Sequence, residues 1–184
     1  MAANEAKSQL VRSEEGDPKG LELGRQQGQA MARTIRHMVE EVAQGGEEVP
    51  CGEYLVAYAV EEAEGMYMPH GDGLRWVEPE EENAHIEVAV RDAADGRFIP
   101  GLTVRVTVIG DDRQEIGTHE HPLLWHPYLY HYGRNWTLPA SGRYRLRVRF
   151  AAPEFPRHDR KNGHRFTTGG DVTFENVEIE TGRD

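Results

Sequence analysis

Cysteine is almost absent from this sequence, because Cys51 is the only one among 184 residues. A single thiol excludes an internal disulfide framework, and it also excludes zinc or iron–sulfur sites built from several thiolates. Any metal site must therefore use histidine, carboxylate or methionine. Cys51 also has no histidine near it in the sequence, so no nucleophile with its base is evident.

Basic residues and long apolar runs are scarce as well. The net charge is −11, which argues against a nucleic-acid partner, since binding phosphate requires a basic face. No apolar run approaches the roughly 20 residues of a membrane-spanning helix. The first twenty or so residues lack the apolar segment of a secretory signal. The sequence as written therefore predicts a cytoplasmic protein, unless a signal has been replaced.

The content of 38% hydrophobic and 29% charged residues is typical of a globular chain. Residues 1–20 are polar and interrupted by glycine and proline, and we expect a mobile arm. Residues 21–46 predict a helix, because an apolar stripe recurs at three- and four-residue steps and Gly45 and Gly46 follow it. The stripe consists of Met31, Ile35, Met38 and Val42.

After residue 46 the hydrophobic period changes from 3.6 to 2. Short alternating or apolar segments are separated by turn residues such as Asp95-Gly96 and Pro100-Gly101, and they lie at 54–60, 84–91, 102–108, 143–150 and 172–179. Strands of this length and spacing predict an antiparallel β-sandwich over residues 50–182.

One strand of the predicted sandwich carries an arginine at every second position, from Arg143 to Arg149. We interpret this stripe as a solvated face paired with acidic neighbours such as Glu175 and Glu178 rather than as an anion site. The acidic run 78–82 is interpreted in the same way, as a solvated loop.

Four of the nine histidines lie in one short segment, HEHPLLWHPYLYHYG, at His119, His121, His126 and His131. Imidazole is the commonest metal ligand and the side chain that titrates nearest neutral pH. The cluster therefore predicts metal chemistry, although His119 and His121 are expected to be exposed or to support the ligands from behind.

A further histidine lies on the predicted strand AHIEVAVRD. If Ile86, Val88 and Val90 face the core, His85 and Glu87 point together to the opposite face. The strand rise separates them by about 7 Å, which is suitable for half of a metal site. A further candidate is Met66-Tyr67-Met68-Pro69-His70, whose two sulfurs and one imidazole share a face if the segment is extended. A methionine-rich core or interface patch is the alternative there.

Taken together, several short motifs occur in a characteristic order between residues 54 and 180. They are His85-Ile86-Glu87, His131-Tyr132-Gly133-Arg134-Asn135, Leu138-Pro139-Ala140-Ser141-Gly142-Arg143-Tyr144, and Arg157-His158-Asp159 with Gly163. In this combination the chain resembles the bacterial ferrous-iron-transport-associated periplasmic proteins. These are small Ig-like sandwiches that bind copper and take part in iron uptake beside a membrane permease.

The resemblance implies an all-β, Ig-like antiparallel β-sandwich with an N-terminal α-helical extension. It implies His85, His131 and His158 as imidazole ligands and Glu87 as the carboxylate. Copper is the expected ion, with iron, zinc and manganese as alternatives. It further implies a homodimer, a membrane iron permease as partner, and a periplasmic location if a signal has been removed.

This chain departs from the family pattern in one ligand. The family uses a methionine several residues before the His-Tyr-Gly histidine, where this chain has Leu124 and His126. We therefore add His126 to the expected ligands; an imidazole in place of a thioether suits Cu(II), zinc or Fe(II). A copper or iron redox enzyme or other metal-dependent enzyme on the same scaffold, and a module that binds a non-metal ligand or a partner through its Tyr/Trp/His cluster, are the other functions considered.

Overall fold

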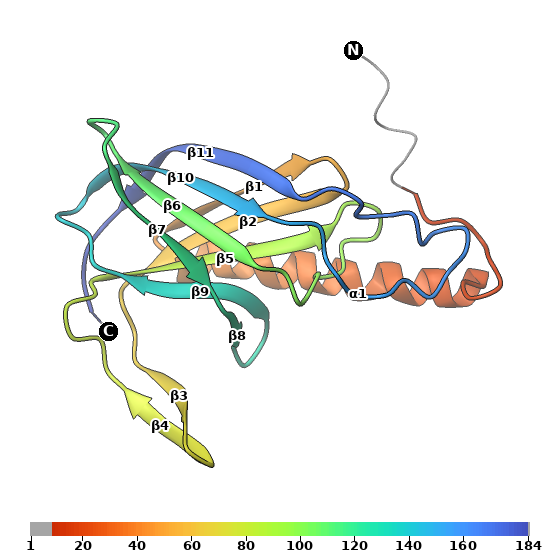
Figure 1. Ribbon diagram of the computed structural model, residues 1–184, viewed down its shortest axis with the longest axis horizontal. Helices are drawn as coiled ribbons and strands as arrows, with labels where there is room; N and C mark the ends of the chain where they lie inside the picture. Colours follow the sequence, from red (N-terminus) through yellow and green to blue (C-terminus); the bar gives the residue numbers. More distant parts are fainter. Residues whose placement is uncertain (1–8, 184) are drawn as a thin grey trace.

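The computed structural model describes residues 9–183, in which one helix precedes two packed sheets and a hairpin (Figure 1). The elements are α1 (Pro18–His37), the π-helical turn η1 (Met38–Val42), β1 (Gly45–Cys51), β2 (Tyr54–Glu61), β3 (Met66–His70), β4 (Gly73–Val77), β5 (Ala84–Asp92), β6 (Val104–Gly110), β7 (Glu115–His121), β8 (Leu123–Trp125), β9 (Tyr130–Trp136), β10 (Gly142–Phe150) and β11 (Gly170–Ile179).

All strand pairs within the sheets are antiparallel. A five-stranded sheet has the order β1-β2-β5-β9-β8, and a four-stranded sheet has the order β11-β10-β6-β7. The core between them contains inward-facing side chains such as Val88, Val106 and Phe174, each at most 1% exposed. The prediction of an antiparallel sandwich with an N-terminal helix is confirmed.

Helix α1 runs along the outer face of the five-stranded sheet (Figure 1). Ile35 packs there against Ala57 of β2 and Ala89 of β5, whose small side chains leave room for the helix. Nearer the N-terminus of α1, Gly28 sits so close to the β5–β6 loop that a Cβ atom would lie 1.7 Å from the carbonyl oxygen of Asp95. The outer face of β2 and β5 is therefore covered rather than wet.

The observed helix differs from the expected one at both ends. It begins at Pro18, where the side chain of Asp17 accepts a hydrogen bond from the backbone N–H of Gly20 (2.6 Å). At its C-terminal end the α-helix passes into η1. A π-helical turn contains more residues per turn than an α-helix, so the apolar stripe is rotated. Met38 stays buried at 2% exposure, whereas Val42 is 48% exposed.

The expected mobile arm falls partly on residues 1–8, which lie outside the described residues. Residues 9–16 run along the loop that joins β10 to β11. The hydroxyl of Ser13 donates to Asp159 (2.5 Å), and the backbone of Val11 exchanges two hydrogen bonds with the side chain of Asn162, both 2.9 Å. This part of the arm is held against the sandwich.

Two sequence patterns on β10 have structural explanations. The hydroxyl of Tyr144 donates to the carbonyl of Ala140 (2.5 Å), which closes the turn before the strand in the manner of a tyrosine corner. On the exposed face, Arg145 pairs with Glu175, and Arg147 pairs with Asp171 at 2.6 Å. The arginine stripe is thus a solvated face with acidic partners, as expected.

The close approach of α1 predicts that Gly28→Ala destabilises the protein by about 1–3 kcal/mol, the usual cost of overpacking, although alanine is the better helix former. The added methyl group would overlap a backbone oxygen, which cannot rotate away. Gly45→Ala is the matched control, since its Cβ meets no atom within 4 Å. Chemical denaturation of both variants measures the effect, and equal stability would contradict this packing.

Candidate metal centre

Strand β5 is buried on both faces, which is unusual for a strand of an antiparallel sandwich. Ile86 and Val88 face the core between the sheets. His85 and Glu87 face the other side and are 0% and 3% exposed. Glu87 lies at a small cavity that is also lined by Met38 of η1 and by Leu129 of the segment before β9. The alternation expected from the sequence is therefore confirmed, but the face of β5 that carries His85 and Glu87 is also excluded from solvent.

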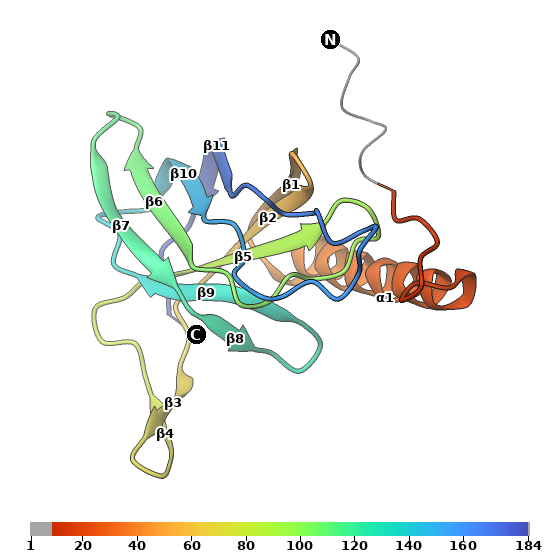
Figure 2. The same ribbon diagram turned by 45° about the vertical axis from the view of Figure 1, so that its right-hand side comes forward.

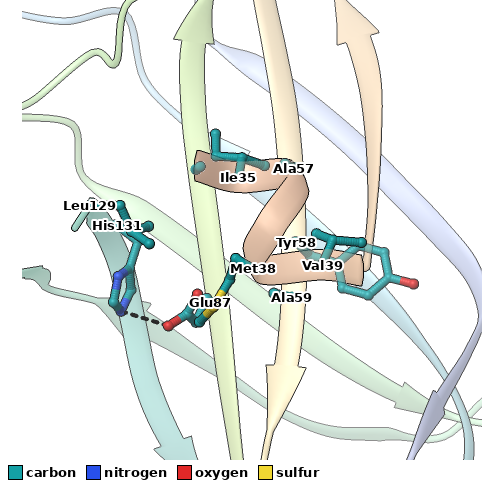
Figure 3. A pocket seen from close by; sticks show the side chains of 10 residues that line it. Ile35, Met38, Val39, Ala57, Tyr58, Ala59, Glu87, Leu129 and His131 are labelled. Carbon is teal, nitrogen blue, oxygen red and sulfur yellow. Dashed lines mark ion pairs between the residues drawn. The ribbon is translucent and has the colours of Figure 1, made fainter. Parts of the chain in front are cut away.

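The structure brings together three of the five residues expected as ligands. Ligand atoms of His85, Glu87 and His131 all lie within 4.8 Å of one another. Nε2 of His131 is 3.1 Å from Oε1 of Glu87, and Nε2 of His85 is 4.0 Å from the same oxygen. Figure 3 shows the His131–Glu87 contact from the side of the cavity. The antiparallel pairing of β5 with β9 produces this group, because Glu87 lies opposite Gly133, two residues after His131.

Asn135 orients the ring of His85. Its Oδ1 atom lies 2.8 Å from Nδ1 of His85, and its Nδ2 atom donates to the carbonyl of Glu64 (2.8 Å). An amide oxygen only accepts, so the proton of His85 is assigned to Nδ1 and the lone pair is on Nε2, the nitrogen nearer to Glu64 and Glu87. The asparagine of the His-Tyr-Gly-x-Asn motif thus hydrogen-bonds to a candidate ligand and fixes the orientation of its ring.

Four buried polar atoms of this group lack a hydrogen bond within the described residues. Among the described residues, Nε2 of His85, Oε1 of Glu87 and both ring nitrogens of His131 have no hydrogen-bond partner. The 3.1 Å contact of Nε2 of His131 with Oε1 of Glu87 is within hydrogen-bonding distance, but its angle is not that of a hydrogen bond. Buried polar atoms without partners are rare and costly. Two imidazoles and one carboxylate converging in this way form a donor set that fits a metal ion.

Gly133 leaves space beside these atoms. A Cβ atom at this position would lie 2.9 Å from Nε2 of His85 and 2.8 Å from Cδ1 of Leu124. Both distances are shorter than real Cβ contacts. The glycine of the His-Tyr-Gly motif is therefore required by the close approach of the donor atoms.

Burial controls the protonation of the group. It lowers the pKa of His85 to about 4 and also lowers the pKa of His131, to which the neighbouring His85 and His126 contribute. Burial raises the pKa of Glu87, and the nearby carboxylates of Glu61 and Glu64 raise it further. The Glu87–His131 pair therefore holds one proton at neutral pH. Displacing that proton leaves two neutral imidazoles and one carboxylate, the forms that bind metals.

Glu61 and Glu64 were not expected from the sequence. Their carboxylates and that of Glu87 form a second group whose atoms all lie within 4.8 Å. Oε1 of Glu64 also lies 3.7 Å from Nε2 of His85. Glu61 is paired with His85 across β2 and β5, and that register, which the sequence pattern does not reveal, brings it here.

The remaining histidines of the cluster have different positions. His126 is half-buried beside Tyr128, with its ring centroid 6.3 Å from that of His131, and thus lies next to the group without joining it. His121 is 1% exposed, and its Nε2 accepts a hydrogen bond from the indole of Trp136 (3.1 Å). His119 packs against the same indole. His121 was not expected to be so deeply buried.

His158 and the methionine-rich segment lie apart from the group within one chain. The side chain of His158 is 92% exposed, and its Nδ1 is 3.2 Å from Glu15 of the N-terminal arm. Met68 and His70 are exposed on β3, in a hairpin that projects away from the sheets (Figure 2). A single copy of the chain therefore does not bring these residues to His85, Glu87 and His131.

The fold and this group define a class of protein: a β-sandwich that carries, on the outer face of one sheet, two imidazoles and a carboxylate that could hold a metal ion. Residues 38–179 match the family described as Fe2+ transport protein, and the chain belongs to that family. No curated protein sequence matches the chain. Helix α1 precedes the matched region.

Solved structures share the fold. The "as isolated" FetP of uropathogenic Escherichia coli strain F11 matches with a TM-score of 0.60 and 20% identity, over 74% of this chain and 94% of that one. The copper-reconstituted P19 protein of Campylobacter jejuni matches with a TM-score of 0.61 and 17% identity, over 76% and 96%. In the described residues, no helix is long and apolar enough to cross a membrane.

The shifted pKa values predict that the metal-free protein is most stable near pH 6.5. Below that pH, buried His85 and His121 resist protonation (their pKa values fall to about 4 and 3), whereas the unfolded chain takes up protons, so stability falls with pH. Above pH 6.5 the Glu87–His131 pair still holds a proton that the unfolded chain has lost, so stability falls as pH rises. Each proton of difference corresponds to about 1.4 kcal/mol per pH unit.

Thermal unfolding of the metal-free protein between pH 4.5 and 8.5 measures both slopes. Glu87→Gln is the control for the alkaline side, because an amide has no proton to retain, and the decline above pH 6.5 should vanish. A melting temperature that rises steadily to pH 8.5 in the unmodified protein would contradict the raised pKa of Glu87.

Proposed function

We propose that this protein binds a copper or ferrous ion in iron uptake, with His85, Glu87 and His131 as ligands. The observation that carries the proposal is the convergence of three buried donor atoms without hydrogen bonds, within 4.8 Å, in a chain of the Fe2+ transport protein family. A bound ion would coordinate all three atoms at once and would offset the free energy lost by burying them without partners.

Copper is the preferred ion for this donor set. The affinity of nitrogen and oxygen sites for divalent metals rises to Cu(II) and falls again at zinc. The solved relatives include a copper-bound FetP variant and a copper-reconstituted P19, and the family description names Fe2+. The carboxylates of Glu61 and Glu64 add negative charge beside Glu87, which favours cations in general. Zinc and manganese are the other ions to be compared.

His131→Ala should abolish stoichiometric metal binding, because it removes one of two imidazoles and leaves Glu87 without its partner at 3.1 Å. We expect affinity to fall by roughly 100-fold or more, beyond the loss that follows when a residue that only orients a ligand is removed. Titration calorimetry with Cu(II) and metal analysis after dialysis are the measurements.

His119→Ala is the matched control, since that imidazole packs on Trp136 outside the group. Circular dichroism establishes that both variants keep the sandwich. Unchanged metal stoichiometry in His131→Ala would overturn the proposed site.

We propose that the protein is a homodimer in which His158 of one copy binds the metal at the site of the other copy. His126 contributes to the site within its own copy. An imidazole that is 92% exposed can reach the group in a second copy more readily than in its own. Exposed aromatic side chains on and beside the edge strand β8 favour self-association: Trp125, Tyr128 and Tyr130 are 70%, 42% and 52% exposed. His126 borders the group in each copy.

Complementation tests this arrangement. His158→Ala and His131→Ala each remove one imidazole, and a dimer formed from the two variants contains one complete site. We therefore expect the mixed sample, after unfolding and refolding together, to regain up to about a quarter of the native Cu(II) capacity, which is statistical pairing of two equal pools. Light scattering establishes the oligomeric state. Full metal affinity in His158→Ala alone would exclude His158 as a ligand.

A periplasmic location and a membrane iron permease as partner complete the proposal. The support is family membership and the FetP structure, whose protein was expressed recombinantly in the periplasm of E. coli. Fractionation of cells that carry the native gene tests the compartment. Uptake of radioactive iron with and without that gene tests the role, and recovery of the protein in the cytoplasmic fraction would contradict the location.

A further inference from the structure

Met38 lies at the same cavity as the candidate ligands, although it comes from a distant part of the chain. It begins the π-helical turn η1 and is 2% exposed. Its side chain lines a cavity of about 20 Å³ together with Glu87 and His131, and Figure 3 shows its sulfur on the side of Glu87. A cavity of this size holds about one water molecule, or one small ion.

Several contacts hold the thioether in this position. The hydroxyl of Tyr128 donates a hydrogen bond to Sδ of Met38 (3.3 Å). One turn earlier, Ile35 fixes the helix on β2 and β5 through Ala57 and Ala89. One residue later, Val39 packs where a Cβ on Gly46 would be only 2.7 Å away. The sulfur is thus confined beside the carboxylate and the imidazole.

The π-helical turn has a specific consequence for this residue. Such turns are rare, and inside helices they are frequent at functional sites. Here the turn starts at Met38 itself, so the apolar stripe of α1 ends on this side chain rather than continuing to Val42, which is 48% exposed. The end of the helix therefore places one soft donor atom, Sδ of Met38, at the cavity, whereas Val42 at the end of the turn is exposed to solvent.

We propose that Met38 is a metal ligand of this site, and that its thioether allows the site to hold Cu(I) as well as Cu(II). The inference rests on the proposed function, since it concerns the same ion. Imidazole and carboxylate donors suit Cu(II), whereas a thioether selects Cu(I). Helix α1 precedes the region shared with the family. It then contributes to metal binding indirectly, because its packing on β2 and β5 positions Met38.

The test compares Met38→Leu with Met31→Leu. Leucine conserves volume and apolar character, so both variants should fold; Met31 lies on the same helix and packs against the Ile35 cluster. Cu(I) affinity is measured without oxygen by competition with a chromogenic Cu(I) chelator. Cu(II) affinity is measured by titration calorimetry.

We expect Met38→Leu to weaken Cu(I) binding by at least about 10- to 100-fold, the loss that removal of a ligand's orienting partner already produces, with Cu(II) affinity changed much less. Copper X-ray absorption of the Cu(I) form should show a sulfur neighbour in the native protein and in Met31→Leu, but not in Met38→Leu. Equal Cu(I) affinity in the two variants, or a native spectrum without sulfur, would overturn the inference. Absence of copper binding in the native protein would instead overturn the proposed function.

Discussion

The docking of helix α1 on the outer face of β2 and β5 is the constraint on which the rest of the site depends. Met38 and Val39, which directly follow α1, line the cavity beside Glu87 and His131, so the docked helix closes this side of the group. Glu87 is 3% exposed and His131 is 3% exposed, and burial raises the pKa of the carboxyl and lowers that of the imidazole. The close approach at Gly28 and the alanines beneath Ile35 make the cover possible.

The group of His85, Glu87 and His131 lowers the stability of the metal-free protein. Within residues 9–183, three buried ring nitrogens and one buried carboxylate oxygen of the group lack hydrogen bonds, and each such atom typically costs about 1–3 kcal/mol. The antiparallel core between the two sheets is large enough to tolerate this, since it contains buried side chains from six strands. The group destabilises the fold when no metal is bound, and one ion would coordinate all of its donor atoms. Metal binding would therefore increase the free energy of unfolding.

The dense histidine segment divides into residues with different roles. His131 belongs to the buried group, and His126 lies beside it. His121 accepts a hydrogen bond from Trp136 in the interior, and His119 packs on the same ring. This division follows from strand geometry: His119 and His121 end β7 in the four-stranded sheet, whereas His131 is in β9 of the five-stranded sheet.

The sequence by itself determined the sandwich and the facing of His85 and Glu87 away from the core, and the resemblance of its motifs to a known family implied that these residues join the His-Tyr-Gly histidine. Those features depend on a period of two along each strand and on short motifs, which are local properties. Only the tertiary structure decided which face is dry, and it alone brought Met38, Glu61 and Glu64 to the group and left His158 on the surface of a single chain. These outcomes depend on strand register and on where a helix docks, and both are determined by packing between segments far apart in the chain.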